Sequence, residues 1–137
     1  ELDALNHVPR GARLISFVGR PCAPGWSVHR LDHLPSMALI RRHAFANDQW
    51  QASGAQLISV RYQQAGPFKS DPNQYVVKPR CARFERRAFP EAIASFPRDA
   101  FDYVWIIQQP DTPVEMEGLQ RIWQNGRSAL YRVVRTK

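Results

Sequence analysis

The sequence predicts an α/β domain with a small mixed sheet of about five strands, two or three helices packed on it, and a C-terminal β-hairpin. Three observations support this prediction. Residues 101–107 form a near-continuously apolar run, as expected of a strand buried on both faces. A short helical pattern precedes that run, which indicates a crossover connection and a partly parallel sheet. Finally, Asn125-Gly126 separates two alternating runs, which is a strong hairpin signal.

Length and composition fit one folded domain over residues 1–137. The chain has 137 residues, of which 44% are hydrophobic and 23% are charged. A chain of this length can bury a stable core without disulfides or metal ions, and this composition argues against disorder. No apolar run approaches the roughly 20 residues that a membrane-spanning helix needs.

The N-terminal half predicts three elements. Residues 1–7 resemble the tail of a helix that began earlier, because Leu2 and Leu5 share a helical face before Pro9 breaks the chain. We therefore expect this segment to be part of a longer protein, with a processed signal peptide as the alternative. Residues 13–19 form an apolar run that predicts a buried first strand. Residues 35–43 favour a helix, although an edge strand is an alternative.

The rest of the chain predicts further strands and short helices. Residues 56–62 alternate and predict a second strand, residues 69–74 predict a surface loop, and residues 75–77 predict a short strand. Proline and glutamate in the first turn predict a helix over 90–96. A brief helical turn is predicted over 114–120, and the hairpin comprises 119–124, the Asn-Gly turn and 127–134. Alternation places Ile122 and Trp123 on opposite faces of this hairpin.

The chain is strongly basic, with a net charge of +7 from 19 basic and 12 acidic residues. Such an excess is typical of proteins that bind nucleic acid or anionic lipid. Here the arginines are dispersed, apart from a cluster at 80–87, and aromatic residues are not interleaved as in single-strand binding platforms. A solvated surface therefore explains the charge better, and we do not expect nucleic acid as the partner.

Two cysteines, Cys22 and Cys81, lie in unrelated segments and form no C-x-x-C pair. Both neighbour loop signals, so a structural disulfide is a candidate if the compartment is oxidising. Two unrelated buried thiols are the alternative. In the chain-entropy model, a bridge closing so long a loop would stabilise the fold by roughly 4 kcal/mol.

Several polar and aromatic residues are candidates for a binding surface. His29 and His33 have the i, i+4 spacing of two imidazoles on one helical face, with Asp32 beside them. Because Pro35 follows closely and no H-E-x-x-H pattern occurs, we predict no metal site. Two tryptophans beside polar residues could stack on a sugar, and two arginines could bind phosphate or an acidic glycan. The candidate binding residues are Trp26, His29, Asp32, His33, Arg41, Arg42, His43 and Trp50.

No recognisable catalytic motif occurs in the chain, and no cofactor is predicted. Gly19 and Gly25 follow the first predicted strand, but the G-x-G-x-x-G spacing of a phosphate-binding loop is absent and prolines remove donor amides. No G-x-S-x-G elbow surrounds any serine. The residues therefore indicate no reaction. A degenerate nucleotide-binding domain, which has lost this spacing, is kept as an alternative.

Two stretches carry a resemblance to a known class of protein. They are FDYVW at 101–105 followed by IWQNGRSALYRV at 122–133, and HLPSMALIRRHAF at 33–45. The chain resembles the soluble C-terminal domain of multispanning bacterial membrane proteins, many of them membrane glycosyltransferases that use lipid-linked sugars. This resemblance implies a small α/β domain on the extracytoplasmic, periplasmic face. The catalytic carboxylate of such enzymes lies in a membrane-side loop near the N-terminus, so no catalytic residue is carried over to this segment.

We therefore expect a non-catalytic domain that binds a substrate, an acceptor or a partner beside the membrane. The expected partners are the transmembrane part of the parent protein and a glycan or lipid-linked sugar. Two alternatives remain open: a basic module that binds nucleic acid, and a degenerate nucleotide-binding enzyme domain.

Overall fold

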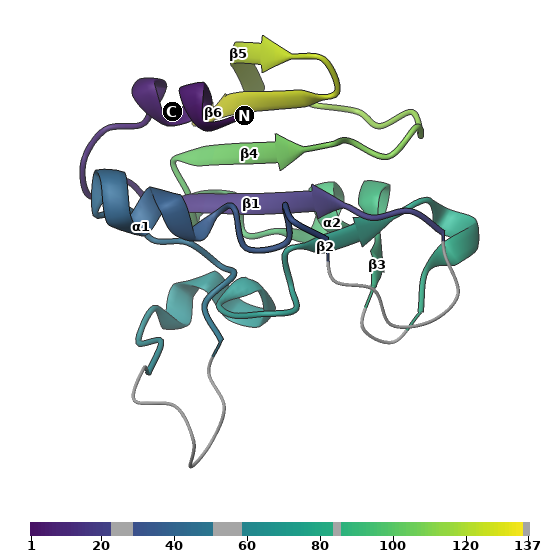
Figure 1. Ribbon diagram of the computed structural model, residues 1–137, viewed down its shortest axis with the longest axis horizontal. Helices are drawn as coiled ribbons and strands as arrows, with labels where there is room; N and C mark the ends of the chain where they lie inside the picture. Colours follow the sequence, from purple (N-terminus) through teal and green to yellow (C-terminus); the bar gives the residue numbers. More distant parts are fainter. Residues whose placement is uncertain (23–28, 51–58, 84–85, 136–137) are drawn as a thin grey trace.

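The computed structural model describes residues 1–22, 29–50, 59–83 and 86–135 (Figure 1). Within these residues six strands form one mixed sheet in the order β3-β2-β1-β4-β6-β5. The strands are β1 (Leu14–Gly19), β2 (Tyr75–Val77), β3 (Arg87–Ala88), β4 (Tyr103–Ile107), β5 (Leu119–Asn125) and β6 (Ser128–Val133). The helices are α1 (Ser36–Arg42), α2 (Phe89–Ser95) and the 3-10 helices η1 (Leu2–His7), η2 (Gln63–Phe68), η3 (Pro79–Cys81) and η4 (Arg98–Ala100). The predicted α/β class, mixed sheet and C-terminal hairpin are confirmed.

The sheet separates two hydrophobic cores. Residues of β1 and β4 alternate between them, so that Phe17 and Ile106 face one core while Leu14 and Trp105 face the other. The first core packs under α2 and η2, and the second under α1 and η1 (Figure 1). A strand that is covered on both faces has no face in contact with water, so it needs no polar side chains. This explains the continuous apolar runs of β1 and β4.

Strands β1, β2, β3 and β4 are parallel, whereas β6 runs antiparallel to β4 and to β5. The parallel strands therefore end at one edge of the sheet (Figure 1). The helix predicted at 90–96 lies between β3 and β4 as α2, in the crossover that the sequence indicated.

Two predicted elements are corrected by the structure. Of the strand predicted at 56–62, residues 56–58 lie outside the described residues and 59–62 form no strand. Tyr62 instead anchors a connection, because its ring packs against Phe45 and Phe101 with centroids 5.0 and 6.2 Å away. The helical turn predicted at 114–120 is also wrong: its last residues belong to β5, where Leu119 pairs with Val133. In both places tertiary packing overrides the local pattern.

The hairpin turn lies one residue later than predicted. Asn125 pairs with Ser128, so the two loop residues are Gly126 and Arg127. Gly126 has φ 56°, the positive angle that the first position of a type II′ turn requires. Glycine alone adopts this conformation without steric strain, so it determines where the chain turns.

A β-bulge changes which side chains of β5 are covered. Arg121 pairs with Tyr131 and Trp123 pairs with Leu130, so Ile122 is an extra residue on β5. Ile122 and Trp123 both pack against the core beneath α1, and their predicted placement on opposite faces is wrong. Among the residues that the structure describes, no helix has the length and hydropathy to cross a bilayer.

Candidate functional site

A cleft opens where the parallel strands β1 and β4 end. The connection that follows β1 leads to α1 on one face of the sheet, whereas the connection that follows β4 packs Val114 and Met116 against the core on the other face. Neighbouring strands whose connections diverge in this way leave a crevice at their carboxyl ends, which is where open α/β sheets bind ligands. The cleft has a volume of about 600 Å³.

We call this the β1–β4 cleft. Its described lining comes from the ends of β1 and β4, from the connections after β1 and β2, and from the hairpin turn. The lining residues are Val18, Gly19, Arg20, Pro21, Cys22, His29, Arg30, Leu31, Lys78, Arg80, Gln108, Pro110, Asp111 and Arg127. Five of these side chains are cationic and one is a carboxylate.

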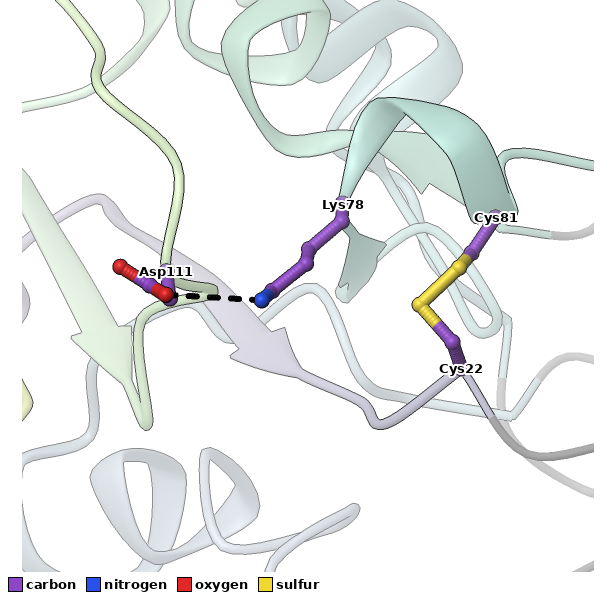
Figure 2. Close-up of a disulfide and its surroundings, with 4 residues drawn as sticks. All are labelled: Cys22, Lys78, Cys81 and Asp111. Atoms are coloured by element: carbon purple, nitrogen blue, oxygen red, sulfur yellow. Dashed lines mark ion pairs between the residues drawn. A yellow bond between two sulfur atoms is a disulfide. The ribbon is translucent and has the colours of Figure 1, made fainter.

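Two of the cations are held by carboxylates. Arg20 lies 3.2 Å from Asp32, and this ion pair is buried, with side chains 7% and 4% exposed. Asp32 also accepts a hydrogen bond of 3.1 Å from the backbone N–H of His29. This bond fixes the backbone of His29 beside the cleft that His29 lines. Lys78 lies 3.5 Å from Asp111, which is almost fully exposed (Figure 2). Water screens such an open pair, so Lys78 can exchange Asp111 for a ligand anion.

Arg30 and Arg80 are exposed at the rim of the cleft. Arg127 extends from the hairpin turn and donates from Nε to the carbonyl oxygen of Gln109 at 3.0 Å. Guanidinium groups present planar forks of N–H donors that match carboxylate and phosphate oxygens. The site can therefore attract and orient an anion.

A disulfide joins Cys22 to Cys81 beside the cleft (Figure 2). Their Cα atoms are 5.6 Å apart although 59 positions separate them in the sequence. The bond ties the segment that leaves β1 to η3, the short helix that follows β2. Because Arg80 lies within η3, this covalent link holds one of the cations at the rim.

The floor of the cleft depends on a close approach between two backbones. A Cβ atom added to Gly19 would lie 1.8 Å from the carbonyl oxygen of Gln108, so only glycine fits there. Gln108 has φ 53°, an uncommon value for a residue with a side chain. Hydrogen bonds hold it: its N–H donates to Ser128 Oγ at 2.9 Å, and its Nε2 donates to Glu1 Oε1 at 2.9 Å.

The structure brings some of the sequence-predicted binding residues together and separates others. His29 lines the β1–β4 cleft and Asp32 lies behind it, paired with Arg20. Cys22 lines the same cleft. Trp26 lies outside the described residues.

The remaining candidates do not line this cleft. Arg41, Arg42 and His43 lie at the carboxyl end of α1, where Arg42 donates to Asn6 at 3.2 Å and Arg10 donates to a ring nitrogen of His43 at 3.1 Å. The side chain of Trp50 is exposed over 62% of its surface. Sequence reasoning therefore grouped residues that the fold distributes over different surfaces.

His33 belongs to a separate cluster around the buried carboxylate of Asp48. Ser36 donates to Asp48 Oδ2 from its backbone N–H and from Oγ, both at 2.8 Å, and His33 Nδ1 lies 4.0 Å from the same oxygen. Burial raises the pKa of Asp48, while the bonds from Ser36 oppose the rise. Because Ser36 donates to the carboxylate and not to an imidazole, this cluster lacks the geometry of an activated serine and instead closes the first turn of α1.

Sequence reasoning missed most of the cleft. Arg20, Lys78 and Arg127 are far apart in the chain, and no spacing or motif connects them. Among the described residues, no group of three or more His, Cys, Asp or Glu side chains could hold a metal ion. Comparisons of the chain with protein-family models, with curated proteins and with solved structures gave no match.

Proposed function

We propose that this chain is a non-catalytic ligand-binding domain on the extracytoplasmic, periplasmic face of a bacterial membrane protein of the glycosyltransferase type. In this proposal the β1–β4 cleft holds the anionic part of a lipid-linked sugar or of its acceptor, beside the transmembrane part of the parent protein. The observation that carries the proposal is the cleft itself, where five cations and one carboxylate meet at the strand ends.

Two further features support this assignment. The bond between Cys22 and Cys81 is of a kind that persists in oxidising compartments such as the bacterial periplasm. The cleft also offers cationic donors that bind and orient an anion, which is the task of an accessory domain when the reacting groups lie elsewhere. The resemblance to C-terminal domains of membrane glycosyltransferases agrees with both features.

Thermal unfolding with small ligands tests the proposal. Pyrophosphate and glucose 1-phosphate should raise the melting temperature at low ionic strength, because a ligand that binds only the native state stabilises it. Glucose, which has no charge, should have no effect. The double variant Arg30→Gln/Arg80→Gln should weaken binding by about tenfold, since each exposed charge contact contributes roughly 1 kcal/mol or less.

A matched control separates cleft binding from a general loss of charge. Arg61→Gln/Arg132→Gln removes two positive charges from exposed positions outside the cleft and should leave ligand binding nearly unchanged. Equal effects of the two double variants, or the absence of any shift with either phosphate compound, would show that the cleft is not an anion site.

A nucleotide is the second candidate ligand. The order β3-β2-β1-β4 matches the first four strands of doubly wound dinucleotide-binding sheets, which bind their ligand at the same switch point between the first and fourth strands. The same melting experiment with ADP and GDP distinguishes the two. A nucleoside diphosphate that stabilises the chain far more than pyrophosphate would favour the nucleotide, because the base and ribose would then contribute contacts of their own.

A further inference from the structure

A second basic cleft lies at the edge of the sheet that β2 and β3 form, beside the amino ends of these two strands. It has a volume of about 580 Å³ and is lined by Pro72, Asn73, Tyr75, Ala82, Arg83, Arg86, Arg87 and Glu91. We call it the arginine cleft, because three of these side chains are guanidinium groups and one is a carboxylate. Its arginines belong to the cluster at 80–87 that stands out in the sequence.

Local structure fixes the backbone of two arginines of this second cleft and the side chain of the third. Arg83 and Arg86 exchange two backbone hydrogen bonds, of 3.0 and 2.9 Å, so their side chains leave from paired positions. The guanidinium of Arg87 lies over the ring of Phe68, 4.5 Å from its centroid. Groups positioned in advance lose less conformational entropy when a ligand binds.

The two clefts adjoin each other on either side of η3. Tyr75 lines the arginine cleft, and Arg20 of the β1–β4 cleft lies over its ring, 4.8 Å from the centroid. Arg80 lines one cleft and Ala82, two residues later, lines the other. The disulfide at Cys81 ties the segment between the two clefts to the connection after β1, and each cleft carries cationic side chains on its own side of that segment.

The lining side chains indicate what kind of anion such a surface accepts. Proteins that bind single-stranded nucleic acid stack successive bases on aromatic side chains. Among the described lining residues of both clefts, Tyr75 provides the one phenol, phenyl or indole ring, and Arg20 already covers a face of it. Arginine forks bind carboxylate and phosphate oxygens alike, so clefts with arginines and without a free stacking ring suit an anionic chain that is held by its charged groups and not by stacked bases.

From this arrangement we infer that the β1–β4 cleft and the arginine cleft together bind one acidic oligosaccharide, a sugar chain with repeated carboxylates that passes around η3. The inference rests on the proposed function and deepens it, because it identifies the ligand of the domain as an extended anionic acceptor. A sugar chain that occupies both clefts binds more tightly than one that reaches a single cleft, because its second contact forms within the complex that is already bound.

Calorimetric titration of the whole chain with oligogalacturonates of increasing length tests this inference. Affinity should rise with length until both clefts are filled, and it should then level off. Arg83→Gln/Arg86→Gln should weaken binding of the longest oligomer by about four- to twenty-five-fold, at roughly two- to fivefold for each exposed contact. It should leave the affinity of the β1–β4 cleft for pyrophosphate unchanged.

The control variant is Arg61→Gln/Arg132→Gln, which removes two exposed charges outside both clefts and should retain the length dependence. Melting temperatures within a degree or two of each other would show that the variants are folded. Maltohexaose, a neutral oligosaccharide, should not bind.

The outcomes separate this inference from the proposed function. Pyrophosphate binding with no length dependence would overturn the extended ligand and leave the β1–β4 cleft as an anion site. Tighter binding of a single-stranded DNA of equal charge would overturn the acidic oligosaccharide in favour of nucleic acid. If neither pyrophosphate nor any oligogalacturonate binds, the proposed function and the inference both fail.

Discussion

The side-chain amide of Asn47 pairs with the backbone of Ser16 as a neighbouring strand would. The N–H of Ser16 donates to Asn47 Oδ1 at 2.7 Å, and Asn47 Nδ2 donates back to the carbonyl oxygen of Ser16 at 3.0 Å. Strand β2 pairs with β1 only at Val18 and Gly19, so it leaves Ser16 without a strand partner on that side. Because both residues are fully buried, this one carboxamide completes the hydrogen bonding of a central strand.

Replacing this amide should therefore be costly. Asn47→Ala leaves a buried N–H and a buried carbonyl unpaired, and we expect it to lower the free energy of unfolding by about 2–4 kcal/mol. Asn47→Asp keeps the acceptor but loses the donor and introduces a buried charge, so it should be at least as destabilising at neutral pH. Urea unfolding measures both, with Asn6→Ala at an exposed position as the control. A loss below about 0.5 kcal/mol for Asn47→Ala would contradict this account.

The disulfide should stabilise the fold and the cleft together. For a closed loop of this length the chain-entropy model predicts that Cys22→Ser/Cys81→Ser lowers stability by about 4 kcal/mol. The double variant should also weaken pyrophosphate binding, because η3 and its Arg80 are then no longer tied to the segment after β1.

Alkylation without reductant, followed by mass spectrometry, checks the bond directly. The native chain should carry no label and the reduced chain should carry two. Two labelled thiols in the native chain would show that the cysteines are not bridged. If the serine variant is folded and still binds pyrophosphate with native affinity, the bond has no role in positioning Arg80.

The ion pairs of Asp102 should contribute to stability in a pH-dependent way. Arg13 donates to this carboxylate from Nε at 3.0 Å, and Arg135 lies 2.9 Å away. The hydrogen bond from the Arg13 side chain holds the pKa of Asp102 below its usual value, despite partial burial. The native state therefore binds this proton less readily than the unfolded chain does.

It follows that Asp102 stabilises the native state above the unfolded pKa of about 3.9, and that this contribution is lost as the pH falls through the lower native value. Asp102→Asn should reduce the melting temperature at neutral pH, and the difference from the native chain should shrink on acidification. Asp3→Asn, at an exposed carboxylate of η1, is the control. A difference that stays constant down to strongly acidic pH would rule out this charge effect.

Gly19 should tolerate no side chain. In Gly19→Ala the new Cβ meets the backbone carbonyl of Gln108, so the ends of β1 and β4 must separate. Overpacking of this kind costs about 1–3 kcal/mol, and the shifted strand ends should also weaken pyrophosphate binding. Gln108→Ala is a useful partner variant: it should not relieve the clash in a double mutant, because the obstructing atom belongs to the backbone. Thermal unfolding and titration measure both effects, and native behaviour of Gly19→Ala would contradict the close approach.

The sequence predicted most elements whose signals are local. An apolar run indicated β4, proline and glutamate in the first turn indicated α2, and a glycine between alternating segments indicated the hairpin. Each signal depends on the conformations open to a few neighbouring residues or on how much apolar surface they must bury. These properties hold wherever the segment lies in the fold, which is why the α/β class could be read from the chain alone.

Other features depend on partners that are distant in the chain. The two-residue strand β3 exists because β2 lies beside it, and the bulge at Ile122 exists because two residues of β5 can then pack on the same core. Asn47 lies in a turn and in no strand, yet its side chain completes the hydrogen bonding of β1. The sequence predicts a strand over 56–62, but its described part, 59–62, forms none, and Tyr62 packs against Phe45 and Phe101 in a connection.

By itself, the sequence determined the fold class, the hairpin and the positions of the buried strands, because hydrophobic pattern and turn chemistry act over short distances. Only the tertiary structure decided where the charges gather. The ends of the parallel strands and the adjoining hairpin turn bring together Arg20, Arg80 and Arg127, which are dispersed along the chain. Charged side chains carry no periodic signal, so their grouping into adjoining clefts follows from strand order and from the bond between Cys22 and Cys81.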